Sequence, residues 1–211
     1  MTLLSILVGL LVSTLAALTT LTTYRMLVVR SVEGSTRATQ DGHMASGTLT
    51  AQMELQSAGF GIGSLALPAL ANTDLVVLSQ ASWANGSLGG TVQTIGSSGA
   101  TSGNAVVWGA RPLLTSYECS ALLAQDSGLM LLRGNCTAAN QWAGASWQKV
   151  GDLIPPAGIG GASAVLRAER ASCWPFAQAA VVPDAIRVTL WNDESSWKSS
   201  VCLPAIKAPS T

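Results

Sequence analysis

The four cysteines are the residues whose chemistry is easiest to predict from the sequence. Cys119, Cys136, Cys173 and Cys202 all follow an apolar N-terminal stretch, and an even number on one side of a membrane span indicates disulfides formed in an oxidising compartment. Of the three possible pairings we expect Cys119–Cys136 and Cys173–Cys202, because each closes a short loop worth about 3 kcal/mol. A zinc site is disfavoured, since there is no Cys-x-x-Cys and the only histidine is the distant His43.

The other reactive residues predict no catalytic site. A hydrolytic triad needs a base beside its nucleophile, whereas His43 stands on a predicted helix, as a solvated or subunit-contact residue. Asp193 and Glu194 fall in a polar turn, and Gly158–Gly161 lacks the Lys-Ser/Thr of a phosphate-binding loop. We therefore expect a non-enzymatic protein without a cofactor or a metal.

Seven tryptophans are many beside two tyrosines and two phenylalanines. Core filling and subunit packing are the favoured roles, and Trp108 and Trp191 end apolar stretches that suit a core. Exposed tryptophans anchor protein or sugar surfaces. Trp83, Trp142 and Trp197 lie in probable loops and are the candidates for surface contacts.

The overall composition is weakly charged. Eleven basic and eleven acidic residues cancel, and charged residues make up 10% of the chain, against about 25% in typical soluble domains. Nucleic-acid binding usually needs a basic face, so no specific nucleic-acid binding is predicted. A surface rich in Ser, Thr, Ala and Gly is found in some extracellular and self-assembling proteins.

The N-terminal stretch predicts a membrane-spanning helix. The first 24 residues carry no charge, and a hydrocarbon layer about 30 Å thick needs roughly 20 apolar helical residues. The stretch begins at residue 1 with no basic residues before it and no Ala-x-Ala cleavage site after it, unlike a secretory signal peptide. We expect a hydrophobic N-terminus that the mature chain retains.

Residues 1–57 are predicted to form one long helix, with 1–24 as the transmembrane or filament-core part. Arg25 and Arg30 follow at the position of interfacial anchors, and further on Met44, Leu49 and Met53 belong to a ragged amphipathic pattern, together with Val28, Val29, Val32 and Leu55. Three glycines and a threonine-rich run disfavour helix. We therefore expect local melting or bending between residues 14 and 47.

Residues 58–211 are predicted to form a β-rich globular head. Apolar runs bounded by turn residues indicate strands, and loops rich in Gly, Ser and Asn are expected at 85–90 and 96–103. The fold class is therefore α+β, a long helix packed through its second half on a mainly antiparallel sheet. The predicted strands are 73–79, 104–108, 128–133, 163–167 and 185–191.

Two motifs resemble type IV pilins and the related pseudopilins. Met1-Thr2-Leu3-Leu4, followed by the apolar run from Ile6, is similar to the mature N-terminus of that family. Gln52–Phe60 resembles the segment that ends the long helix in minor pilins of the W type, where a Leu-rich turn leads into Ala-Gly-Phe or Ala-Gly-Tyr. Ser5 departs from the family's usual glutamate, and Thr22 from its common proline.

The resemblance implies a life cycle of processing and assembly. A prepilin peptidase would remove a short leader and methylate the new amine, here Met1. The subunit would wait in the inner membrane until an assembly platform moved it into a helical filament with copies of itself or other pilins. Some members at the filament tip lack the glutamate, so Ser5 favours a minor or tip subunit, with a major subunit as the alternative. The expected filament-core residues are Met1, Leu3, Leu4, Ser5, Ile6, Leu7, Val8, Leu10 and Leu11.

The expected function is that of a structural subunit of an extracellular type IV pilus-like filament, which serves adhesion, motility or DNA uptake in this family. A pseudopilin of a type II secretion system is the alternative. A third reading, from another class, is a single-pass membrane-anchored enzyme or binding domain with a soluble head.

Overall fold

The computed structural model describes residues 3–63, 68–113, 116–156, 164–174, 181–192 and 197–209. The chain divides into two units at His43. The first unit consists of helix, and the second, residues 44–211, is a compact head that begins with the last turns of the same helix. This arrangement confirms the coarse α+β prediction of a long apolar N-terminal helix followed by mostly antiparallel sheets.

Helix α1 spans Leu3–Gln56 without a break, so the predicted melting between residues 14 and 47 is wrong. The threonine-rich part is helical, and its hydroxyls donate to carbonyl oxygens one turn earlier, as Thr20 does to Ala16 (2.7 Å) and Thr23 to Thr19 (2.8 Å). Such bonds satisfy the hydroxyl inside the helix and leave the backbone ladder in place. Gly34 and Gly42 each cost about 1 kcal/mol, which does not interrupt a helix of 54 residues.

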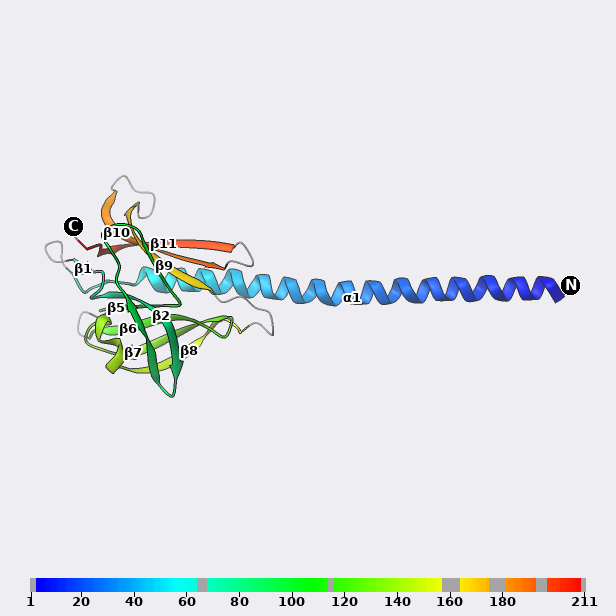
Figure 1. The fold of residues 1–211 in the computed structure, drawn as a ribbon, viewed down its shortest axis with the longest axis horizontal. Helices are drawn as coiled ribbons and strands as arrows, with labels where there is room; N and C mark the ends of the chain where they lie inside the picture. The colour runs from blue at the N-terminus through cyan, green and yellow to red at the C-terminus, as the bar shows by residue number, and fades with distance from the viewer. Residues whose placement is uncertain are drawn as a thin grey trace. The chain divides into compact units, whose positions relative to one another are not determined.

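Two sheets build the described part of the head (Figure 1). One has the strand order β1-β11-β10-β9-β4 and the other β3-β2-β5-β6-β7-β8; β1 pairs parallel to β11, and the other pairs within the sheets are antiparallel. The strands are β1 Ala69–Leu70, β2 Leu75–Ala84, β3 Ser87–Gln93, β4 Ala100–Gly103, β5 Ala105–Ala110, β6 Glu118–Gln125, β7 Gly128–Asn135, β8 Ser146–Ile154, β9 Val165–Cys173, β10 Val182–Asn192 and β11 Trp197–Lys207, with a 3-10 helix η1 at Ala139–Gly144.

The five predicted strands correspond to β2, β5, β7, β9 and β10, and Ser163 lies outside the described residues. The prediction of loops at 85–90 and 96–103 is wrong, because these ranges contain the start of β3 and the whole of β4. These Gly- and Ser-rich segments have little strand propensity of their own. Pairing of β3 with β2 and of β4 with β9 supplies their backbone hydrogen bonds.

The central strands of the six-stranded sheet are buried on both faces, which explains why their buried residues do not alternate with exposed ones. Every residue of β5 is buried, as are six consecutive residues of β6. One face encloses a core with Trp147, Leu123 and η1, and the other faces the core that the two sheets share with α1. Continuous apolar strands are the pattern expected of a sheet covered on both sides.

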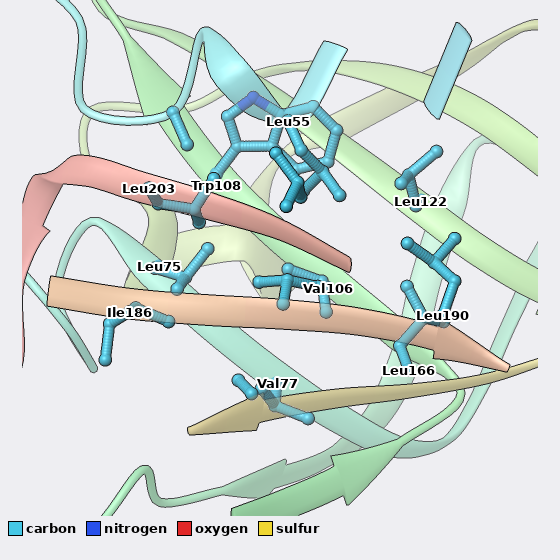
Figure 2. Packing of buried hydrophobic residues seen from close by; sticks show 14 of the residues in the cluster. Leu55, Leu75, Val77, Val106, Trp108, Leu122, Leu166, Ile186, Leu190 and Leu203 are labelled. Atoms are coloured by element: carbon cyan, nitrogen blue, oxygen red, sulfur yellow. The ribbon is translucent and has the colours of Figure 1, made fainter. Parts of the chain in front are cut away.

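The last turns of α1, residues 44–56, lie between the two sheets (Figure 1). Leu55 packs with Trp108 of the six-stranded sheet, and Leu203 comes from the opposite sheet (Figure 2). The helix buries a row of mostly small residues, and a Cβ on Gly47 would come within 2.7 Å of Ile154 Cγ1.

The predicted amphipathic pattern needs correction, because Leu49 and Met53 face solvent. The buried row is Gly47, Thr48, Ala51, Leu55 and Ala58, flanked by Met44.

Both predicted disulfides are present. Cys119 of β6 pairs with Cys136 just after β7, with 5.8 Å between the Cα atoms. Cys173 at the end of β9 pairs with Cys202 of β11 at 5.7 Å. The first bridge therefore joins the neighbouring strands β6 and β7 at their end, whereas the second joins β9 to β11, which have β10 between them in the strand order.

Candidate assembly surface

The candidate functional surface is the apolar part of α1, in the unit that ends at His43. Its large apolar side chains are between 43% and 67% exposed, which is far more than a helix of a globular core shows. They occur on every side of the helix, the pattern of a helix that is buried all round in its functional state. They are Ile6, Leu7, Val8, Leu10, Leu11, Val12, Leu15, Leu18, Leu21, Tyr24, Met26, Leu27, Val28, Val29 and Val32.

The same segment is long and apolar enough to cross a membrane. Its best window has a mean hydropathy of 1.9, and none of that window is buried. At 1.5 Å per residue, a span of about 30 Å takes roughly 20 residues, which the uncharged stretch up to Tyr24 supplies. Ser13 and Thr14 bond to the carbonyls of Leu10 and Leu11 (3.0 and 2.9 Å), so these hydroxyls need no water.

The sequence-predicted filament-core residues lie on this surface where the structure describes them. Ser5 is exposed on α1, as are Ile6, Leu7, Val8, Leu10 and Leu11. Met1, predicted as the processed and methylated residue, and the side chains of Leu3 and Leu4 lie outside what the structure describes. The first charged side chain after them is Arg25.

Comparison with protein-family models, curated proteins and solved structures finds no match for this chain.

The segment Gln52–Phe60 joins α1 to both sheets. Gln52 Nε2 donates to the carbonyl of Ser200 in β11 (3.2 Å), and Glu54 Oε2 lies 2.7 Å from Arg133 Nη2 of β7. Arg133 also donates to Ser120 of β6. Because these bonds reach opposite sheets, the last turn of the helix is held from two sides.

The chain leaves α1 through a turn that only glycine suits. Gly59 has φ of +78°, and a Cβ there would come within 2.8 Å of Ile206 Cδ1, so an alanine would be both strained and crowded. Its N–H donates to the Gly109 carbonyl (2.9 Å), and the Arg111 N–H donates to the Phe60 carbonyl (2.7 Å). The predicted helix-ending motif therefore fixes the last turn of α1 to both sheets within the head unit.

The tryptophan predictions have a mixed outcome. Trp142 is wrong as a surface contact, because it is 7% exposed and its carbonyl accepts a hydrogen bond from Trp147 Nε1 (2.9 Å). Trp83 is half-buried against the same core, and the side chain of Trp197 lies outside the described residues. Trp174 is 61% exposed and was missed.

A buried polar network stands in the head, around residues that the sequence did not single out. Tyr117 Oη donates to Asp74 Oδ1 (2.9 Å) and accepts from the Ala139 N–H (3.1 Å), while Asp74 Oδ2 accepts from the Leu70 N–H (2.9 Å). Burial raises the pKa of Tyr117 well above its usual value, and neighbouring Asp74 raises it further. The network ties together the turn between β1 and β2, the segment before β6 and the start of η1.

Replacing Tyr117 with phenylalanine is expected to lower the free energy of unfolding by about 2 kcal/mol at pH 7, because the buried Asp74 Oδ1 and the Ala139 N–H each lose a partner. Above a pH of about 10 an unfolded tyrosine loses its proton while the folded Tyr117 keeps it, so the unfolded chain binds fewer protons and wild-type stability falls. The difference in free energy of unfolding between wild type and Y117F, measured by urea unfolding, should therefore be smaller at pH 11 than at pH 7. Tyr24→Phe, at a 67% exposed site, is the matched control; a gap that stays constant with pH would contradict the assignment.

Metal-binding residues do not gather in the described part of the chain. No group of three or more His, Cys, Asp or Glu side chains there is placed to hold an ion. His43 is exposed on α1, and Asp193, Glu194 and Gly158–Gly161 lie outside the described residues.

Proposed function

We propose that this chain is a structural, non-enzymatic subunit of an extracellular type IV pilus-like filament, and that α1 is its assembly element. The observation that carries the proposal is the uncharged helix surface from Ser5 to Tyr24, apolar on all sides and exposed in the single chain. The contacts of Gln52–Phe60 support it, because they hold the last turn of the same helix against both sheets of the head.

The physical reason is that the apolar helix must be shielded from water both before and after assembly. Exposing apolar surface to water costs about 25 cal/mol per Å², so a helix of this kind is stable either in lipid or against other apolar helices. In the membrane the lipid tails cover it, and in a filament the helices of neighbouring subunits do. Extraction from one environment into the other then changes little apolar exposure and is energetically close to balanced.

The position within the filament follows from Ser5. A charged N-terminal amine inside a filament core is costly unless an anion pairs with it, and the Ser5 hydroxyl brings no charge. This favours a minor or tip subunit over a major one. Before assembly the chain would reside in the inner membrane, and its partners there would be the assembly platform and the prepilin peptidase.

The test is the fate of the protein when filaments are sheared from cells. Quantitative mass spectrometry of the sheared, sedimented fraction should find the intact chain with both disulfides, and immunogold labelling of the head should decorate filaments. A tip subunit predicts a trace amount at filament ends, and a major subunit predicts labelling along the length. Recovery from detergent-extracted membranes alone would overturn the proposal and favour a secretion pseudopilin or a membrane-anchored binding domain.

A further inference from the structure

The sheet edges of the head differ in how well they are protected. Exposed edges pair readily with other chains, and proteins block them with short strands, charges and bulges. In the five-stranded sheet the edge strands are β1, with two residues, and β4, with four. In the six-stranded sheet the edge strand β8 carries the ion pair of Lys149 with Asp152 and has two register shifts against β7.

The remaining edge strand, β3, has seven residues and no charged side chain. It pairs only with β2 among the described strands, and the register shift in that pairing sets Gln80 and Ala81 of β2 against Gly90 of β3, whose φ is +151°. Trp147 of β8 contacts the turn before β3, where its N–H donates to the Gly86 carbonyl (2.8 Å), and β8 and η1 both lie close to β3. The backbone of residues 89–93 is left as an open edge, with Val92 49% exposed.

The β3 edge carries no charged side chain that would repel the same edge of a second copy of the chain. Between Asp74 and Arg111 the sequence carries no charged side chain, so β2, β3, β4 and β5 are uncharged throughout. Two identical β3 strands can therefore meet without bringing like charges together. An antiparallel pair of identical strands is related by a twofold axis, and each strand then gives the other the same set of donors and acceptors.

We propose that β3 is a strand-pairing edge for the β3 of a second copy of this chain, through residues 89–93. The pairing would extend the six-stranded sheet of one head into that of the other. Subunits within one filament are related by a helical operation, so a twofold contact of this kind joins heads of neighbouring filaments side by side. The pairing does not depend on the proposed filament function, because two heads in solution can form it as well.

Single introduced thiols test the contact. All four native cysteines are in disulfides, so a short bismaleimide will join only introduced residues. Val92→Cys on β3 is compared with Val150→Cys, which is 59% exposed on the protected edge β8. The full chain is used in detergent, with micelles in large excess over chains so that helices do not share one micelle. We expect at least tenfold more covalent dimer from V92C than from V150C.

A charge on the edge should abolish the pairing. Adding Thr91→Lys to the V92C chain should lower the dimer yield at least fivefold. Adding Gln148→Lys, at an exposed site of β8, to the V92C chain should leave the dimer yield unchanged. Equal yields from V92C and V150C, or a yield that Thr91→Lys does not reduce, would overturn the inference. If circular dichroism shows that V92C is destabilised, Thr91→Cys with Val92→Lys gives the same comparison. Dimers in detergent without filaments on cells would leave the strand contact standing and refute the filament function alone.

Discussion

Replacing Leu11 with aspartate is expected to reduce the protein in sheared filaments by at least 100-fold. An aspartate near the centre of a membrane span costs about 3 kcal/mol relative to leucine, and each 1.4 kcal/mol is about a factor of ten. Along its own chain the new carboxylate is ten residues from the N-terminal amine and fourteen from Arg25, too far to share a turn of helix with either cation. A buried charge without a partner in contact is more costly still. The measurement is the ratio of the chain in the sheared fraction to the chain in whole cells, by immunoblot.

Two controls separate assembly from folding. Leu11→Met keeps the volume and the apolar character of the site, so its ratio should stay within twofold of wild type. Leu49→Asp places the same charge on α1 at an exposed site of the head unit, outside the uncharged span, and should leave membrane insertion intact. Normal amounts of L11D in sheared filaments would show that the apolar surface of α1 is not the assembly element.

Replacing Trp108 with alanine is expected to lower the free energy of unfolding of the head by about 4 kcal/mol. Trp108 is fully buried in the core shared by α1 and both sheets (Figure 2), and its Nε1 donates to Ser57 Oγ (3.1 Å). The truncation leaves a cavity beside Leu55 and removes a bond to the helix-ending turn. Because a domain is stable by only about 5–15 kcal/mol, the loss is a large share of the total.

Urea unfolding followed by circular dichroism, with both disulfides oxidised, measures this loss. Trp174→Ala removes the same side chain from a site that is 61% exposed, and surface changes of this type usually stay within about 0.5 kcal/mol. The difference between the two variants is therefore the effect of burial. Similar unfolding midpoints for W108A and W174A would mean that Trp108 is not part of a close-packed core.

The contrast between these two tryptophans shows what local sequence can and cannot predict. Trp108 follows the apolar run Ala105–Val107, so its burial was expected. Trp142 stands among Asn, Gln, Ala and Gly, which suggests an exposed site. However, η1 places it on the face of the six-stranded sheet opposite the core shared with α1, against Trp147. Local composition carries no information about which distant strand will cover a residue.

The same reasoning applies to the edge strands and to the buried network. The strands β3 and β4 are rich in Gly and Ser and were read as loops, because their structure comes from hydrogen bonds to β2 and β9. Asp74 and Tyr117 are 43 residues apart, and nothing in their local sequence indicates that they meet. The second sheet was missed for the same reason, since strand pairing between distant segments is set by the packing of the whole head.

By itself the sequence determined the properties that depend on neighbouring residues. These are the uncharged span up to Tyr24, the helix continuing to Gln56, the strands made of long apolar runs, and the two local disulfides. Only the tertiary structure decided that the last turns of α1 lie between two sheets, that Leu49 and Met53 face solvent while Gly47 meets β8, and that β3 is left as an open edge. The physical reason is that helix propensity and hydrophobic span act over a few turns, whereas burial and strand pairing are settled by contacts between residues far apart in the chain.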